Sequence, residues 1–183
     1  MLRYMIRLAL AAFERRYAYN VDHLRAIADV DAPGAIRIQI AQALAAHRFG
    51  LPVEVYFAGL LVAVRQADCG TCLDLVMKMA RRAGVRRETV RAVLLESVPE
   101  DEPTGVGLAA AFASAVVTWD HRLNELGEAV QRRWGVRGRA GLAAAIAGAG
   151  FYPSLKRGLG VAQACAPVSE HVRRFDAVAA DRP

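Results

Sequence analysis

Two cysteines, Cys69 and Cys72, form a C-x-x-C motif at the start of an apolar run with helical spacing. The first turn of a helix has unpaired N–H groups and a partial positive charge, which together favour a thiolate. The two-residue spacing also allows the sulfurs to form a disulfide without unfolding the turn. In a cytosolic protein an isolated C-x-x-C is more often catalytic or metal-binding than structural. The pattern therefore favours thiol–disulfide chemistry.

Two other interpretations of the cysteines are open. A structural zinc site needs four ligands, and only Cys165 and His171 are obvious candidates to complete one. Free cysteines also pack readily as small apolar side chains, and Asp68 places an unfavourable negative charge beside a Cys69 thiolate. We expect no metal and no cofactor. We expect Cys165 to be a packed residue of the tail, with a third redox thiol or a partner-facing thiol as the alternatives.

The elements that must position the motif are predicted to be short helices, because glycine, proline and capping residues interrupt runs with helical periodicity. The helix before the motif, Val53 to about Ala67, is apolar on most sides and is expected to be buried. The motif opens the next helix, which ends at Gly84. Other helices are expected to start near residues 21, 31, 86, 108 and 139. Thr118 is expected to cap a helix that runs to Trp134.

These elements predict an all-α fold, a compact multi-helix bundle with short connections. We expect one all-helical domain over residues 1–183. Within it, residues 1–30 form an N-terminal helical arm that packs on the core or on a partner subunit. Residues 35–160 form the core, and residues 161–183 form a tail.

Four stretches around the motif form a further pattern. They are PVE at 52–54, FAGLLVAVRQADCGTC at 57–72, AGV at 83–85 and VRRETVRAVL at 85–94. Together they resemble the alkylhydroperoxidase D / carboxymuconolactone decarboxylase superfamily, in which a buried helix leads into a C-x-x-C that opens the next helix. The resemblance covers roughly residues 35–160. It implies an all-helical bundle of the alkylhydroperoxidase D-like type and a homo-oligomer. It also implies thiol-dependent reduction of hydroperoxides, with the disulfide recharged by a disulfide-exchange protein partner.

Two positions depart from the family's peroxidase pattern. That pattern has Glu twelve residues before the first Cys, where this chain has Phe57, and His four residues after the second Cys, where it has Val76. The resemblance implies that these side chains relay protons to the second thiol, so their loss removes an acid–base contribution of about 10²–10⁴-fold. Glu54 lies one helical turn before Phe57 and can reach the same face. It is therefore the third candidate catalytic residue, beside Cys69 and Cys72.

The identity of the attacking thiol stays open. Helix-end electrostatics favour Cys69 as the low-pKa thiol, whereas the resemblance assigns attack to Cys72 and resolution to Cys69. His47 or His121 can supply an imidazole from another helix. The predicted function is a thiol–disulfide oxidoreductase that is weak or altered as a peroxidase. The alternative is a non-enzymatic, oligomeric helical protein that kept the fold and lost the proton relay.

Composition limits the partners of the chain. The net charge is +6, but the arginine pairs are spread over the predicted helices, which is typical of solvated helix faces rather than of a nucleic-acid surface. No segment reaches the about 20 apolar residues of a membrane span. Arg7 interrupts the apolar N-terminal run, which argues against a signal peptide and for a cytoplasmic protein. Apolar residues make up 55% of the chain, and this surplus favours a homo-oligomer, as a dimer, trimer or trimer of dimers.

Overall fold

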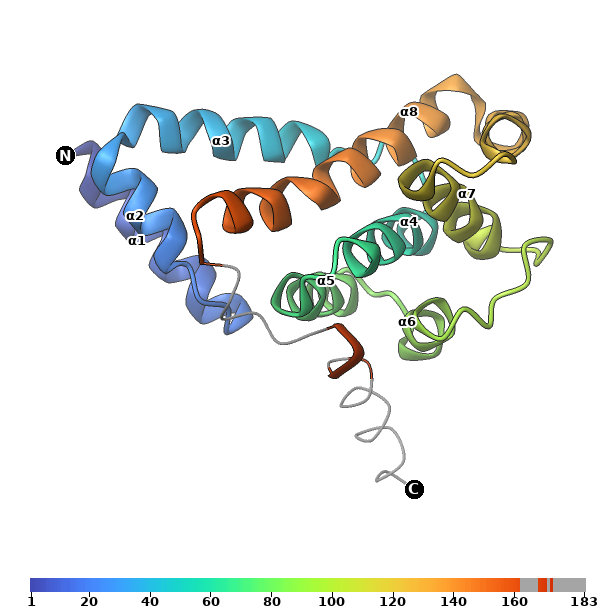
Figure 1. The fold of residues 1–183 in the computed structure, drawn as a ribbon, viewed down its shortest axis with the longest axis horizontal. Coiled ribbons are helices and arrows are strands. Elements are labelled where there is room, and N and C mark those ends of the chain that lie inside the picture. The colour runs from blue at the N-terminus through green and yellow to red at the C-terminus, as the bar shows by residue number, and fades with distance from the viewer. Residues whose placement is uncertain (162–167, 171, 173–183) are drawn as a thin grey trace.

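The computed structural model describes residues 1–161, 168–170 and 172 of the chain. These residues form an all-α bundle and contain no strand, which confirms the prediction of an all-α fold (Figure 1). Its elements are α1 (Leu2–Tyr17), α2 (Asp22–Val30), α3 (Ala32–Ala45), α4 (Val53–Gln66), α5 (Gly70–Arg82), α6 (Arg87–Leu94), α7 (Val106–Thr118) and α8 (Leu123–Gly158).

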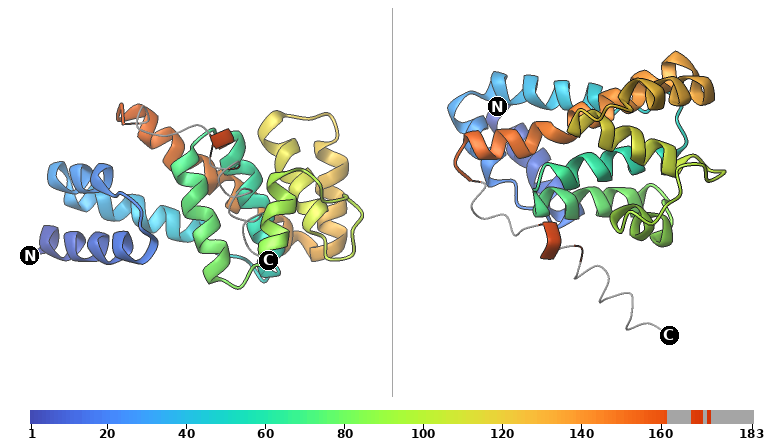
Figure 2. Two further views of the ribbon diagram at one scale, coloured as in Figure 1. Left: turned by 90° about the horizontal axis from the view of Figure 1, so that it is seen from below. Right: turned by 45° about the vertical axis from the view of Figure 1, so that its right-hand side comes forward.

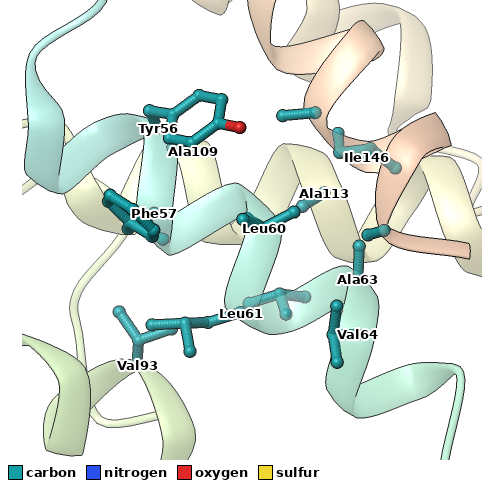
Figure 3. Packing of buried hydrophobic residues seen from close by; sticks show 14 of the residues in the cluster. Tyr56, Phe57, Leu60, Leu61, Ala63, Val64, Val93, Ala109, Ala113 and Ile146 are labelled. Atoms are coloured by element: carbon teal, nitrogen blue, oxygen red, sulfur yellow. The ribbon is translucent and has the colours of Figure 1, made fainter. Parts of the chain in front are cut away.

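α4 is the central helix of the bundle. Its residues from Val55 to Val64 are all buried, because α5, α6, α7 and α8 each contact it. Figure 3 shows side chains of α4 beside those of its neighbours α6, α7 and α8. At Gly59 the missing side chain allows a close approach of α8, since a Cβ there would lie 2.9 Å from Cδ2 of Leu142. The prediction of a buried helix before the C-x-x-C is confirmed.

α8 consists of two helical segments that meet at Gly135. This residue has φ 70° and ψ 178°, a conformation that glycine adopts without a Cβ clash. The first segment packs along α7, and the second runs back across α4 and lies along α3 (Figures 1 and 2). The second segment continues through Pro153 to Gly158.

Thr118 does not cap the helix that follows it. It is the last residue of α7, and its hydroxyl donates to the carbonyl of Ser114 at 2.9 Å. Asp120 accepts the N–H of Arg122 at 2.7 Å, immediately before α8 begins at Leu123. The sequence pattern was ambiguous because a threonine hydroxyl can bond either to the turn behind it or to the turn ahead.

α1 and α2 lie at one end of the bundle and form an apolar cluster separate from the main core (Figure 1). Arg25 of α2 pairs with Glu14 of α1, and Arg7 of α1 pairs with Asp29 of α2 at 2.8 Å. α1 also contacts α3 and α5. Whether this arm meets a partner subunit stays a prediction. Among the helices of the described residues, none combines the length and the apolar content needed to cross a membrane.

Candidate functional site

The two cysteines of the C-x-x-C are joined by a disulfide, with Cα atoms 5.2 Å apart. Asp68 adopts a left-handed conformation, with φ 48°, and so turns the chain from α4 into α5. Cys69 directly precedes α5, while Cys72 lies in its first turn. Both side chains are buried. The sequence therefore correctly predicts a closely spaced pair at the start of a helix.

A cavity of about 620 Å³ lies beside this pair, between α1, α2 and α3 on one side and α4, α5 and α8 on the other. Cys72 lines the cavity, whereas Cys69 is not among its lining residues. Most of the wall is aliphatic or aromatic, and none of the described residues in it is an acid, an arginine or a lysine. Gln39 and Ile40 of the wall are exposed, so the cavity reaches the surface. The two cysteines thus have different surroundings.

The family's two relay positions hold buried apolar side chains. Phe57 packs edge-on against the ring of Tyr56, with centroids 5.2 Å apart, and does not line the cavity. Val76 does line it, one helical turn after Cys72. Neither side chain can carry a proton.

Glu54 lies in an ion pair between α4 and α6. Its Oε1 accepts from Nε of Arg86 at 2.9 Å and from the hydroxyl of Thr89 at 3.3 Å. The guanidinium of Arg86 holds the pKa of this carboxyl below its ordinary value. Glu54 is not among the residues that line the cavity with Cys72. The structure thus joins two of the three candidate residues and leaves Glu54 in a separate contact.

The imidazole that shares the cavity with Cys72 belongs to His23 of α2. His47 and His121 are both exposed, and His121 pairs with Asp120 at 3.2 Å. His23 instead lines the cavity, is only 7% exposed, and has an Nε2 with no hydrogen-bond partner in the described part of the chain. Burial, aided by the charge of Lys156, lowers the pKa of His23 to about 4. The imidazole is therefore neutral at pH 7.

Lys156 provides a buried cation at the other side of the disulfide. It is 6% exposed, its Nζ donates to Oγ1 of Thr71 at 3.1 Å, and it lies 4.7 Å from the ring centre of Tyr19. Oγ1 of Thr71 is 3.7 Å from Sγ of Cys69. Sequence reasoning missed both Lys156 and His23. Their only signal was a polar residue within an otherwise apolar helical pattern, which does not tell what the residue contacts.

No group of three or more His, Cys, Asp or Glu side chains among the described residues is arranged to hold a metal ion. Cys165 and His171, the two further ligands that a zinc site would use, lie outside the described residues. The expectation for Cys165 as a packed tail residue falls outside them as well.

Comparisons of the chain with protein-family models, with curated proteins and with solved structures gave no match. The site is thus defined by its own geometry: a C-x-x-C disulfide at the start of a helix, with Cys72 in the wall of an apolar cavity.

Proposed function

We propose that this protein is a thiol–disulfide oxidoreductase of the alkylhydroperoxidase D type, weak or altered as a peroxidase. The observation that carries the proposal is the Cys69–Cys72 pair at the start of α5, with Cys72 in the wall of the cavity. A thiol that reacts with a substrate needs access to it, and Cys72 has that access. This supports Cys72 as the attacking thiol and Cys69 as the resolving thiol.

The wall of the cavity favours an uncharged, apolar hydroperoxide as the oxidant. A charged substrate would lose its hydration there without gaining an opposite charge among the described wall residues. In the oxidising step the Cys72 thiolate attacks the terminal oxygen of the hydroperoxide. The O–O bond breaks, the alkoxide leaves and is protonated to an alcohol, and Cys72 becomes a sulfenic acid. The Cys69 thiolate then attacks this sulfur, which forms the disulfide and releases water.

A disulfide-exchange partner, such as a dithiol protein of the cytoplasm, returns the two electrons. The loss of the family's relay accounts for a low rate, because Phe57 and Val76 cannot assist proton transfer to or from the thiols. Glu54 is a candidate only through its helical spacing, since its carboxylate accepts hydrogen bonds from Arg86 and Thr89.

The test is a count of free thiols before and after mild oxidation by cumene hydroperoxide. The reduced wild-type protein has three cysteines, and we expect it to lose two thiols and to regain them with dithiothreitol. Neither Cys69→Ser nor Cys72→Ser can form the pair, so neither variant should lose two thiols together. A wild-type protein that keeps all its thiols, or a paired loss that survives either substitution, would refute the proposal.

A second candidate is a non-enzymatic helical protein in which the disulfide is structural. The buried apolar side chains at both relay positions favour it. Peroxide consumption at the background rate, together with an unchanged assembly in the double Cys69→Ser, Cys72→Ser variant, would support this alternative over the redox proposal.

A further inference from the structure

The proposed redox chemistry gives no role to Lys156, although this residue is a buried cation beside the disulfide. A charge that leaves water is costly unless local groups compensate for it. Lys156 is held by the hydroxyl of Thr71 and by the face of the Tyr19 ring. It is not among the residues that line the cavity. Its position therefore relates it to the disulfide and not to a ligand in the cavity.

Thr71 connects the cation to one sulfur of the pair. Its Oγ1 accepts from Nζ of Lys156 at 3.1 Å and lies 3.7 Å from Sγ of Cys69. A hydroxyl that accepts one hydrogen bond can donate its own hydrogen to another atom. Once the disulfide is reduced, a Cys69 thiolate would accept this hydrogen, with a positive charge directly behind the donor. Hydrogen bonds to charged acceptors are about twice as strong as neutral ones.

We infer that Lys156, acting through the hydroxyl of Thr71, stabilises the thiolate of Cys69 and makes Cys69 the leaving group when the disulfide opens. Lys156 is thus a positioning residue for the pair. The inference deepens the proposed function and rests on it. It also gives the two thiols separate roles. The helix end, Thr71 and Lys156 act on Cys69, the resolving thiol, while Cys72, the attacking thiol, lies in the wall of the cavity.

The reducing step follows from this division. A thiolate of the dithiol reductant attacks Sγ of Cys72. The S–S bond breaks, its electron pair stays on Sγ of Cys69, and a mixed disulfide forms at Cys72. The second thiolate of the reductant then attacks the reductant's first sulfur, and the bond between that sulfur and Sγ of Cys72 breaks. The reductant leaves as a disulfide, and the Cys72 thiolate takes a proton from solvent.

Other charged groups near the start of α5 either favour or disfavour a thiolate at Cys69. Asp68 precedes Cys69 and is exposed, and its negative charge disfavours a thiolate. Arg157 of α8 donates to the carbonyl of Ala67 and favours a thiolate. His23 of α2 is neutral above its pKa of about 4. The lysine differs from all of these in being buried and in reaching the sulfur through a hydroxyl, which is why we assign the largest effect to it.

The experiment isolates each thiol in turn in the full-length chain. In the Cys72→Ser, Cys165→Ser background, Cys69 is the remaining cysteine, and its thiolate is titrated by absorbance at 240 nm. We expect its pKa to lie at least about one unit below the ordinary value of about 8.5. This titration needs no peroxide turnover, so it can fail or succeed independently of the proposed function.

Two substitutions then test the chain of contacts. Lys156→Met removes the charge and keeps the length of the side chain, and Thr71→Val removes only the hydroxyl. Each should raise the pKa of Cys69 by about one unit, which is a tenfold smaller thiolate fraction at pH 7. Thr71→Val keeps the inference testable if the lysine variant does not fold.

Two controls separate this effect from a general structural change. Lys78→Met removes the other lysine, which lies on α5 and pairs with Asp74 at 2.7 Å, and it should leave the pKa of Cys69 unchanged. In the Cys69→Ser, Cys165→Ser background, Lys156→Met should shift the pKa of Cys72 far less. An ordinary pKa for Cys69, or equal shifts with Lys78→Met and Lys156→Met, would overturn the inference.

Discussion

His23 and Lys156 are polar residues that the fold keeps almost entirely out of water. They differ in what offsets the free-energy cost of burying a charge. Lys156 keeps a hydroxyl and an aromatic face as partners, whereas His23 gives up its charge, because burial and the nearby ammonium lower its pKa. At neutral pH the cavity wall therefore holds an uncharged imidazole, a group that can accept or donate a hydrogen bond to a substrate.

The lowered pKa of His23 predicts a loss of stability in acid. The unfolded chain binds a proton at this residue below about pH 6.5, whereas the folded chain does so only below about pH 4. The contribution of His23 to the stability of the folded chain is thus complete above about pH 6.5, and it is lost as the pH falls from about 6.5 to about 4. We expect a fall of roughly 2–3 kcal/mol in the free energy of unfolding from this group. Urea denaturation between pH 7 and 4 measures it.

His23→Leu is the matched variant for this prediction, since it keeps an apolar side chain in the wall and cannot titrate. Its stability should fall distinctly less than that of the wild type over the same pH range. Parallel pH profiles in the two proteins would show that His23 titrates normally in the folded state.

Glu54 tests whether helical spacing alone identifies a catalytic acid. Because its carboxylate is bound to Arg86 and Thr89, we expect Glu54→Gln to leave the rate of peroxide consumption unchanged. The free energy of unfolding should fall by about 0.5–1 kcal/mol, as for a partly exposed ion pair. A steady-state peroxide assay and a denaturation curve measure the two effects. A large loss of rate at full stability would restore Glu54 to the site.

At the scale of elements, the pairing of α4 with α5 determines which side chains can serve the thiols. Val76 of α5 lies one turn after Cys72 and lines the same cavity. Phe57 of α4 is buried against Tyr56 outside the cavity wall. A glutamate at position 57 would therefore bury a carboxylate in the core, whereas a histidine at position 76 would place an imidazole beside Cys72.

Val76→His should consequently raise peroxide turnover. A titrating imidazole within hydrogen-bond reach of a thiol raises the rate by about 10²-fold or more. We expect the turnover of peroxide to rise at least about tenfold in this variant. Turnover is measured with cumene hydroperoxide and excess dithiothreitol. Val76→Asn, which is polar but does not titrate near neutral pH, is the control. Equal rates in the two variants would show that the imidazole does not reach the thiol.

At the scale of the whole molecule, α1 has two apolar faces. Ile6, Leu10 and Phe13 face the cavity, while Tyr4, Leu8 and their neighbours Leu2 and Met5 are exposed. The outer side chains recur three and four residues apart and so share one face of the helix. Contiguous exposed apolar surface of this kind commonly marks an interface. We propose that this face packs against a second copy of the chain.

The assembly is tested by light scattering at micromolar concentration. We expect a mass of at least twice 19.8 kDa for the wild type, and a smaller mass for the double variant Tyr4→Lys, Leu8→Lys. Trp119→Lys is the control, because Trp119 is also exposed but lies between α7 and α8. A monomeric wild-type protein would refute the proposed homo-oligomer and leave the apolar face of α1 unexplained.

The sequence by itself determined the helices and the pair of cysteines. Apolar periodicity, together with Gly and Pro at the boundaries, identified α4 and α5 to within about two residues. The C-x-x-C spacing brought Cys69 and Cys72 together, because residues three apart at a helix start are neighbours whatever the rest of the chain does.

Only the tertiary structure decided what surrounds the two sulfurs. Lys156 and Thr71 are 85 residues apart in the chain, and their contact exists because α8 turns back at Gly135 and crosses α4. His23 reaches the cavity because α2 packs against α1 and α3 at one end of the bundle. Periodicity shows which face of a helix is apolar, but not which helix that face meets. Contacts between distant helices depend on packing, and packing is a property of all the helices together.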